Sequence, residues 1–307
     1  MEYTDKIAAV DRMRQYIVDN LNELNLDDLC ASVGYSKFYA IRMFKDIAGK
    51  TPFEYARALR LTKAAEELRD SGGKVIDAAF QSGFDSHDGF TRAFMRQFKI
   101  TPQKYIRETP PISYFIPYAF KPFYNHRKEG EYIMRNEKVS QTVTVTAVER
   151  PARKLILLRC KTAFKSSCGG GDYFAFCEEM GCDWEGLLSS IPEKFTTAAL
   201  MGLPQNLVKP GTADSAAGVE VPADYNKPLP EGYEMIDLPP CTMLFFNGAP
   251  FENGEDFGIA IDIVFEAIAN YNFELYGWQA APELAPHFNF GTPEGGGARM
   301  AIPVKAK

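Results

Sequence analysis

One stretch decides the fold of the first third of the chain: Gly83-Phe84-Asp85-Ser86-His87-Asp88-Gly89-Phe90-Thr91-Arg92-Ala93-Phe94. The glycine predicts a tight turn, and Ser86 is a residue type that caps the start of a helix. Phe90 and Phe94 fall on one face of that helix, with Thr91 and Arg92 on the other. The stretch therefore predicts a short helix that is held by buried aromatic rings and presents a polar, cationic edge.

The same pattern occurs about 50 residues earlier, so the first 110 residues hold an internal repeat. Two copies of a packing unit would account for the repeated glycines, phenylalanines and Thr-Pro pairs. That interpretation does not explain why an outward arginine recurs. The matched residues are Gly34 with Gly83, Ser36 with Ser86, Arg42 with Arg92, Phe44 with Phe94, and Thr51-Pro52 with Thr101-Pro102.

Each copy reads as two short helices joined through a glycine turn, which is the helix-turn-helix pattern. The helix between the copies has about 18 residues and would be about 27 Å long. A rod of that length can hold two recognition helices roughly one DNA turn apart, about 34 Å. The apolar spacing predicts helices near residues 5–20, 26–33, 37–48, 52–70, 75–80 and 87–98, with a last one from residue 102.

Residues of about 5–108 resemble the DNA-binding domain of the AraC/XylS family. The resemblance implies an all-α domain with two helix-turn-helix units that read adjacent segments of the major groove. The motifs that carry it are Gly34-Tyr35-Ser36-Lys37-Phe38, Arg42-Met43-Phe44-Lys45, Gly83-Phe84, Phe90-Thr91-Arg92-Ala93-Phe94 and Thr101-Pro102-Gln103-Lys104-Tyr105.

By position, this resemblance implies two sets of DNA-binding residues. Arginine can bind guanine through two hydrogen bonds, and aspartate can accept one from cytosine. Alternatively, Asp88 caps its own helix, His87 is an ordinary polar surface residue, and the lysines are merely solvated. The implied contacts are Lys37, Phe38, Tyr39, Ile41, Arg42 and Lys45 in the first unit and His87, Asp88, Thr91 and Arg92 in the second, with Lys50, Lys99 and Lys104 as further phosphate contacts.

A junction over residues 109–135 is rich in proline and aromatic residues. The prolines exclude a continuous helix, and the aromatic residues are too many for a loose tether. We expect an extended arm that packs on one or both domains. The chain therefore divides into residues 1–110, a linker over 111–137, and a second domain over 138–307.

The second domain changes from helical spacing to alternation with a period of two. The order strand, helix, strand, strand occurs twice, which predicts an α+β fold with antiparallel sheets. It resembles the GyrI-like effector-binding domain of Rob-type regulators. The stretches that carry this resemblance are Gly218-Val219-Glu220-Val221-Pro222, Pro230-Glu231-Gly232-Tyr233-Glu234, Leu238-Pro239-Pro240-Cys241, Tyr276-Gly277-Trp278, Ala285-Pro286 and Ile302-Pro303-Val304.

The GyrI-like resemblance implies an aromatic cleft with a buried acid that pairs with cationic, apolar ligands. Asn289 stands where many relatives have that acid, which leaves Glu220 and then Glu274 as candidates. A neutral or anionic ligand stays open, since Arg299 is available. Alternatively, each aromatic residue is ordinary core packing. The candidates are Tyr173, Phe176, Trp184, Glu220, Phe246, Glu274, Tyr276, Trp278, Phe288, Asn289 and Phe290.

Composition limits the other function classes. The net charge is −6, most of it in the second domain, whereas the first is nearly neutral. The six cysteines form no C-x-x-C pair and only three histidines are present, so no metal and no cofactor are expected. The chain shows neither a signal peptide nor an apolar run of about 20 residues, which predicts a cytoplasmic protein.

Together these features predict a ligand-responsive transcriptional regulator rather than an enzyme. Its partners would be double-stranded promoter DNA, an apolar or aromatic small molecule and, if it is an activator, RNA polymerase. No Ser-His-Asp or Cys-His arrangement is apparent, and His126 and His287 have no obvious catalytic partner. The alternatives are a GyrI-like domain that hydrolyses small molecules or one that sequesters another protein.

Overall fold

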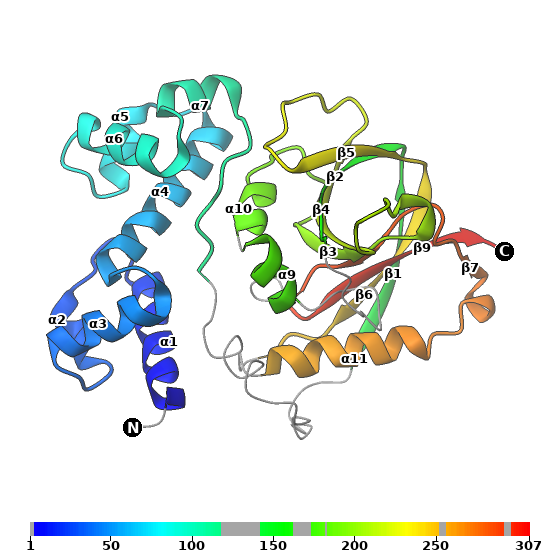
Figure 1. Cartoon of the computed structure of the whole chain (residues 1–307), viewed down its shortest axis with the longest axis horizontal. Helices are drawn as coiled ribbons and strands as arrows, with labels where there is room; N and C mark the ends of the chain where they lie inside the picture. The colour runs from blue at the N-terminus through cyan, green and yellow to red at the C-terminus, as the bar shows by residue number, and fades with distance from the viewer. Residues whose placement is uncertain (1–2, 118–141, 162–172, 182, 252–255, 292–295) are drawn as a thin grey trace. The chain divides into compact units, whose positions relative to one another are not determined.

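The computed structural model describes residues 3–117, 142–161, 173–181, 183–251, 256–291 and 296–307. The chain forms two compact units, Met1–Tyr132 and Ile133–Lys307, which are shown in Figure 1. Within the described ranges, no helix is long and apolar enough to cross a membrane.

The first unit is all-helical, and every helix predicted for it is present. The helices are α1 (Tyr3–Asp19), α2 (Leu26–Ala31), α3 (Lys37–Ala48), α4 (Pro52–Ser71), α5 (Val75–Gln81), α6 (His87–Phe98) and α7 (Pro102–Glu108).

The repeat is visible in how these helices begin and turn. Gly34 and Gly83 both have φ +72°, a left-handed conformation that glycine adopts without strain. The Ser86 Oγ atom accepts a hydrogen bond from the Gly89 N–H group at 3.1 Å, as expected of a cap. Ser36 occupies the same position before α3, but its hydroxyl makes no capping hydrogen bond. Ser36 is thus the N-cap residue of α3 by position, as its place in the repeat predicts, but it lacks the hydrogen bond that Ser86 makes.

Two apolar clusters fill the first unit, and α4 contributes to both. Phe44 belongs to the first cluster and Phe94 to the second, and both are 0% exposed. Tyr55 and Leu59 of α4 pack in the first cluster, whereas Leu68 packs in the second. This helix of 20 residues, about 30 Å long, is thus a shared support for the two helix-turn-helix units.

Residues 110–117, which we call the strap, return along the helical unit. Tyr114 is buried in the second cluster, and its hydroxyl lies 3.1 Å from that of Tyr105. Phe115 reaches the first cluster, where its ring meets Tyr55 edge-on at 4.7 Å. The predicted packing of the arm is confirmed for the strap, while the part beyond residue 117 lies outside the described residues.

The second unit contains one antiparallel sheet. Its order is β1-β6-β9-β8-β3-β4-β2-β5, with β7 paired to β9. The helices of this unit are α9 (Tyr173–Met180), α10 (Asp183–Ser189) and α11 (Phe257–Ala269). The strands are β1 (Val143–Arg150), β2 (Arg153–Arg159), β3 (Ala199–Gly202), β4 (Ser215–Pro222), β5 (Tyr233–Leu238), β6 (Cys241–Gly248), β7 (Trp278–Ala280), β8 (His287–Asn289) and β9 (Arg299–Ala306).

The predicted strand-helix-strand-strand repeat is present in the topology. In the first copy β2 is followed by helices, β3 and β4, and the strands lie in the order β2-β4-β3. In the second, β6 is followed by α11, β8 and β9, and the strands lie in the order β6-β9-β8. Pairing of β3 with β8 joins both copies into one continuous sheet instead of two. Strand β7 was not predicted.

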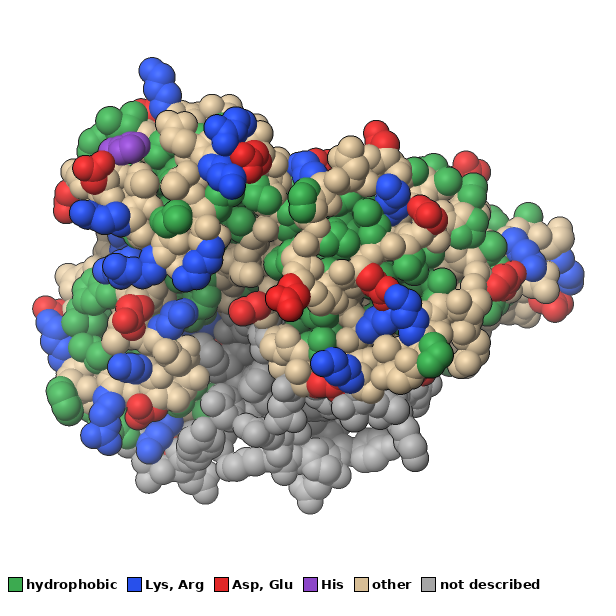
Figure 2. All heavy atoms as spheres, turned by 45° about the horizontal axis from the view of Figure 1, so that its top comes forward, with side chains coloured by type: hydrophobic (Ala, Val, Ile, Leu, Met, Phe, Trp, Pro, Cys, Tyr) green, Lys and Arg blue, Asp and Glu red, His purple; other side chains and the backbone are tan. Residues whose placement is uncertain are grey.

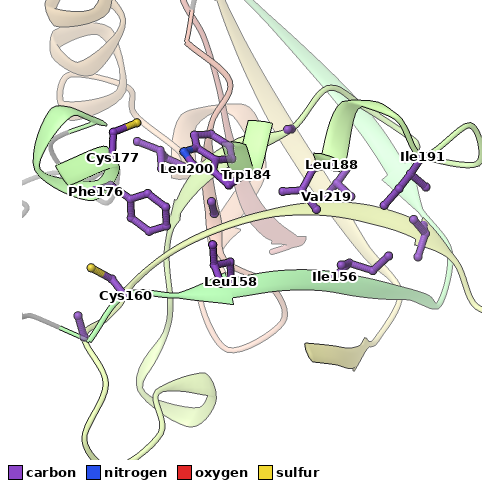
Figure 3. Close-up of a cluster of buried hydrophobic side chains, with 14 of the residues drawn as sticks. Ile156, Leu158, Cys160, Phe176, Cys177, Trp184, Leu188, Ile191, Leu200 and Val219 are labelled. Carbon is purple, nitrogen blue, oxygen red and sulfur yellow. The ribbon is translucent and has the colours of Figure 1, made fainter. Parts of the chain in front are cut away.

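The two faces of the sheet are covered differently. On one face α9 and α10 pack over Ile156, Leu158 and Val219, as Figure 3 shows, and α11 packs over β6 and β9. The other face, which we call the inner face, gathers side chains from both copies of the repeat. Its members include Leu155, Leu157, Met201, Met243, Phe245, Phe288, Phe290 and Ala301.

Candidate nucleic-acid interface and ligand site

Helix α3 presents a mixed apolar and cationic edge. Phe38 is 79% exposed, and Arg42 and Lys45 are exposed as well. Tyr39 and Ile41 are only half-buried, and the Tyr39 ring lies 5.3 Å from that of Tyr35 and packs against the core. Phe38, Arg42 and Lys45 are therefore the implied contacts that α3 offers most fully.

Helix α6 presents a more polar edge. His87, Asp88 and Arg92 are exposed, and the His87 Nδ1 atom lies 3.4 Å from the Asp88 carboxylate. Because Ser86 caps the helix, Asp88 is not needed for that purpose. Thr91 differs from the expectation of an outward hydroxyl. Its Oγ1 atom is shielded from solvent and has no hydrogen-bond partner in the described part of the chain.

Arg42 and Arg92 occupy equivalent positions of the repeat, and both are exposed. The nearest carboxylate recorded for Arg42 is that of Asp46, at 3.9 Å from its Nε atom. An exposed pair of this kind contributes little stability, so the guanidinium group can exchange it for another partner. Figure 2 shows lysine and arginine side chains over both halves of the helical unit, at the left of the view.

The lysines implied as phosphate contacts differ in their surroundings. Lys37 forms an exposed ion pair with Asp27 at 2.8 Å, and Lys104 lies 3.7 Å from Glu108. Lys99 donates to a backbone carbonyl, and Lys50 lies over the Phe115 ring. Among the described residues, no carboxylate lies within 4 Å of the Lys45 ammonium group. Lys45 is therefore the lysine best placed to meet a phosphate.

The structure does not bring the eleven predicted ligand-binding residues together. Phe176 of α9 and Trp184 of α10 are buried between their helices and the sheet, as Figure 3 shows, and Phe246 of β6 is buried beneath α11. For these three, core packing is the role that the structure gives. Tyr173 begins α9, but its side chain lies outside the described residues.

Four further candidates lie away from the inner face. Tyr276 is 61% exposed and stacks on Tyr271 at 5.0 Å, and Trp278 packs against the α11 cluster. The Glu274 carboxylate forms an exposed ion pair with Lys307 at 3.1 Å. The Asn289 Oδ1 atom accepts a hydrogen bond from Gly291. Of the eleven, Glu220, Phe288 and Phe290 remain on the inner face.

Glu220 is 2% exposed and is held by arginines of this chain. Its Oε1 atom accepts a hydrogen bond from the Nε atom of Arg153, a fully buried side chain that also donates to the Pro239 carbonyl at 2.8 Å. Its Oε2 atom lies 3.4 Å from the Nε atom of Arg150. Burying a carboxylate is costly unless a charge and hydrogen bonds compensate it. The acid that was expected to meet a cationic ligand is therefore already neutralised by the protein.

Aromatic rings surround the remaining cations of the inner face. The Arg150 guanidinium lies over Phe195 and Phe245, with its carbon 5.6 and 5.4 Å from their centroids. The Arg299 guanidinium lies 4.7 Å from the centroid of Phe290. Phe245 and Phe290 are themselves stacked, 5.8 Å apart and inclined by 16°. Burial, and then the positive charge of Arg150, lower the pKa of Arg299.

Sequence reasoning missed Arg150, Arg153, Phe195 and Phe245. The alternation of side chains along a strand could have found two of them, Arg150 and Arg153. Arg150 is two residues from Val148, which packs on the inner-face cluster, and Arg153 is two residues from the buried Leu155. Such spacing puts both arginines on the inner face. Their joint contact with Glu220 depends on strand register, which the local pattern does not contain.

A separate hollow of about 160 Å³ lies between β3, β4 and β8. It is bordered by Asp214, Ser215 and His287, and burial lowers the pKa of that histidine. None of the residues predicted to bind a ligand borders it. Its volume is comparable to that of a cavity that holds benzene, so it could take water, an ion or one small aromatic ring.

Comparison with known proteins agrees with the helical geometry. A helix-turn-helix domain family matches residues 29–108. Over 97 residues the chain is 36% identical to regulatory protein SoxS of Salmonella typhimurium (strain LT2), a match that covers 31% of this chain and 91% of SoxS. The chain belongs to the AraC family.

The AraC-family match also includes larger proteins. The chain is 47% identical over 92 residues to the right origin-binding protein of Escherichia coli (strain K12), which is 30% of this chain and 32% of that protein. The match thus spans about a third of that relative's length. The organisation of the second unit is compatible with the Rob-type combination of an AraC-type domain and a GyrI-like domain.

Two solved structures extend the comparison. A probable AraC family transcriptional regulator from Rhodopseudomonas palustris is 26% identical and aligns with 33% of this chain and 95% of its own, with a TM-score of 0.31. SAV2435 bound to tetraphenylphosphonium is 15% identical and aligns with 53% of this chain and 94% of its own, with a TM-score of 0.34. Scores this low carry no argument about ligand or mechanism.

Proposed function

We propose that this AraC-family chain is a transcriptional regulator that binds promoter DNA through α3 and α6 and senses a small apolar or aromatic molecule in its second unit. The observation that carries the first part is the repeated, exposed arginine. Arg42 and Arg92 stand at equivalent positions of two helix-turn-helix units that share α4. The names of the relatives, an origin-binding protein and a regulatory protein, support it.

In this proposal the two helices read adjacent segments of one face of a duplex. Each arginine reaches the O6 and N7 atoms of a guanine, while Lys45 contacts a phosphate. Asp88 accepts a hydrogen bond from a cytosine amino group, and Phe38 contacts a thymine methyl group or the sugar edge. The polar edge of α6 therefore discriminates bases more strongly than the apolar edge of α3.

The second unit supplies control in this proposal. Its inner face is built from both copies of the repeat, so a ligand there would contact both and change how they pack. The unit binds its ligand without turning it over. If the protein is an activator, RNA polymerase is a further partner, and the DNA-bound helical unit is where it would be recruited.

The DNA contacts can be tested on a site selected from random sequence with the full chain. Arg42→Ala and Arg92→Ala should each weaken binding by about 1–3 kcal/mol and relax base preference at one position, as measured by fluorescence anisotropy. Lys305→Ala, which removes an exposed cation from the second unit, is the control and should bind like the wild type. Wild-type affinity in both arginine variants would refute the groove assignment.

A further inference from the structure

We propose that the inner face binds an aromatic ligand that carries an anionic group, and that Arg150 and Arg299 hold this group. The inference rests on the proposed sensing function of the second unit and specifies the chemical class of the ligand. It reverses the preference for cations that the GyrI-like resemblance implies.

The first argument is the balance of charge. Glu220 and Arg153 form a closed pair, because Arg153 donates its other hydrogen bonds to the Pro151 and Pro239 carbonyls and to the Cys241 sulfur. Arg150 shares only the second oxygen of Glu220, at 3.4 Å. Within the described residues, Arg299 has no carboxylate within 4 Å, and its Nη2 atom donates to the neutral Thr197 hydroxyl at 3.1 Å. The described charges of this face therefore leave an excess of positive charge.

The second argument is hydrogen bonding. The Nε atoms of Arg150 and Arg299 are both shielded from solvent. That of Arg299 donates a hydrogen bond to no described residue, and that of Arg150 has only its 3.4 Å ionic contact with Glu220, which lacks hydrogen-bond geometry. Buried donors without a partner are costly, so such groups are usually satisfied by something. A carboxylate suits the planar donor edge of a guanidinium group because it can accept two parallel hydrogen bonds.

The third argument is the aromatic environment. Arg150 lies over Phe245 and Arg299 lies over Phe290, and these two rings are stacked on each other. An aromatic ligand can continue such a stack while its charged group meets the guanidinium groups. Bound cations would instead add to the repulsion between Arg150 and Arg299, which already helps to lower the pKa of Arg299. An anion would relieve this repulsion.

The test compares ligands of one shape and three charges on the full chain. Isothermal titration calorimetry in a low-chloride buffer would measure 2-naphthoate, 2-naphthylmethanol and 2-naphthylmethylammonium. We expect 2-naphthoate to bind at least about tenfold more tightly than the other two. A further titration with 2-naphthyl phosphate tells whether a carboxylate or a phosphate is preferred, and either preference over the alcohol supports an anion site.

Arg299→Gln is the decisive variant, because Arg299 makes no ion pair within the described residues. It should bind the anion and the alcohol within about threefold of each other. Lys305→Gln is the matched control, since it removes an exposed cation of the same unit, and it should keep the wild-type preference. Thermal melting of both variants verifies that they fold.

Three results would overturn the proposal. They are an equal or tighter affinity for the ammonium compound, an unchanged preference for the anion in Arg299→Gln, and the absence of saturable anion binding up to about 5 mM. DNA binding is measured separately on the selected site. Failure to bind any selected DNA would refute the regulator proposal alone, whereas failure of the anion preference with DNA binding intact would refute only this one.

Discussion

The lysines of α3 differ in how free they are to contact a DNA phosphate. Lys45 has no carboxylate within 4 Å among the described residues, whereas Lys37 is paired with Asp27. Lys45→Ala should therefore weaken binding to selected and scrambled sites about equally. It should also reduce the slope of log affinity against log salt by about 1. Anisotropy titrations over a range of salt concentrations would measure both.

Lys37→Ala is the matched control for this prediction, because Lys37 must give up its 2.8 Å ion pair with Asp27 before it can contact a phosphate. It should change the salt slope by less than Lys45→Ala does. A loss that is confined to the selected site, with an unchanged salt slope, would mean that Lys45 reads a base and not a phosphate.

The outward arginines could be predicted because the helical period alone decides their direction. Arg42 and Arg92 fall opposite Phe44 and Phe94 within one turn or two of the same helix, so no distant contact is needed. Glu220 is different. Arg150 and Arg153 reach it from β1 and β2, and that meeting is decided by the pairing of distant strands. The local sequence pattern therefore could not predict that Glu220 is paired with arginines on the inner face.

Among the elements, α4 and α7 start with matched threonines, and within the described residues Thr51 makes two hydrogen bonds that Thr101 lacks. The Oγ1 atom of Thr51 and that of Thr101 each accept a hydrogen bond from a backbone N–H group at 3.3 Å. Only at Thr51 do the backbone N–H group and the hydroxyl also donate to a side chain, the Glu54 carboxylate, at 2.8 Å each, because Lys104 stands at the equivalent position of α7. Each threonine-to-alanine change should cost about 1 kcal/mol of unfolding free energy, and Thr51→Ala should cost more because it also removes the hydroxyl bond to Glu54. Urea unfolding followed by circular dichroism would measure it.

This difference should depend on pH. The Thr51 backbone hydrogen bond, and then its side chain, hold the pKa of Glu54 below its ordinary value. A lowered folded-state pKa adds stability above the ordinary pKa, and this is lost as the pH falls through the lowered value. The excess cost of Thr51→Ala over Thr101→Ala should thus stay constant from neutral pH down to the ordinary glutamate pKa of about 4.3 and shrink as the pH falls below it. A constant excess would contradict the capping box.

The two apolar clusters of the helical unit predict local effects of core mutations. Phe44 and Phe94 are repeat equivalents, and each is 0% exposed. Phe44→Ala and Phe94→Ala should each cost about 3–5 kcal/mol. Hydrogen exchange should accelerate mainly in α1–α3 for the first and in α5–α7 for the second. Equal acceleration throughout the unit in both variants would contradict the division into two clusters.

The helices were predictable because their caps, glycine turns and apolar spacing are local. Strand β7 was missed because three residues, Trp278–Ala280, carry no readable alternation and depend on pairing with β9. The joining of both repeats into one sheet rests on three paired positions between β3 and β8. Pairing between such distant segments cannot be predicted from the sequence of either segment alone.

For the whole helical unit, we expect that a fragment without the strap is less stable than one that keeps it. Ile112 and Tyr114 are buried, and the Phe115 N–H group donates to the Thr62 hydroxyl at 2.9 Å. The unfolding free energy of a fragment that ends at residue 117 should be at least about 2 kcal/mol larger than that of a fragment that ends at residue 109. Thermal and urea unfolding of both fragments would measure this.

Substitutions in the full chain check that result without truncation. Tyr114→Ala should lower the melting temperature, whereas Ser113→Ala, at an exposed neighbouring position, should leave it unchanged. Equal melting temperatures for the two variants would mean that the strap does not stabilise the helical unit.

The unbroken 20-residue course of α4 has a consequence for how this protein can evolve. One inserted residue would rotate everything beyond it by about 100°, which would swing α6 away from the DNA face that α3 reads. Four inserted residues would nearly restore the rotation but add about 6 Å, close to two base pairs, over which the duplex itself turns by roughly 70°. If α3 and α6 bind DNA as proposed, new target sequences are open to this protein through exchanged side chains on these two helices, whereas a change in the length of α4 would put the two helices out of phase on the duplex.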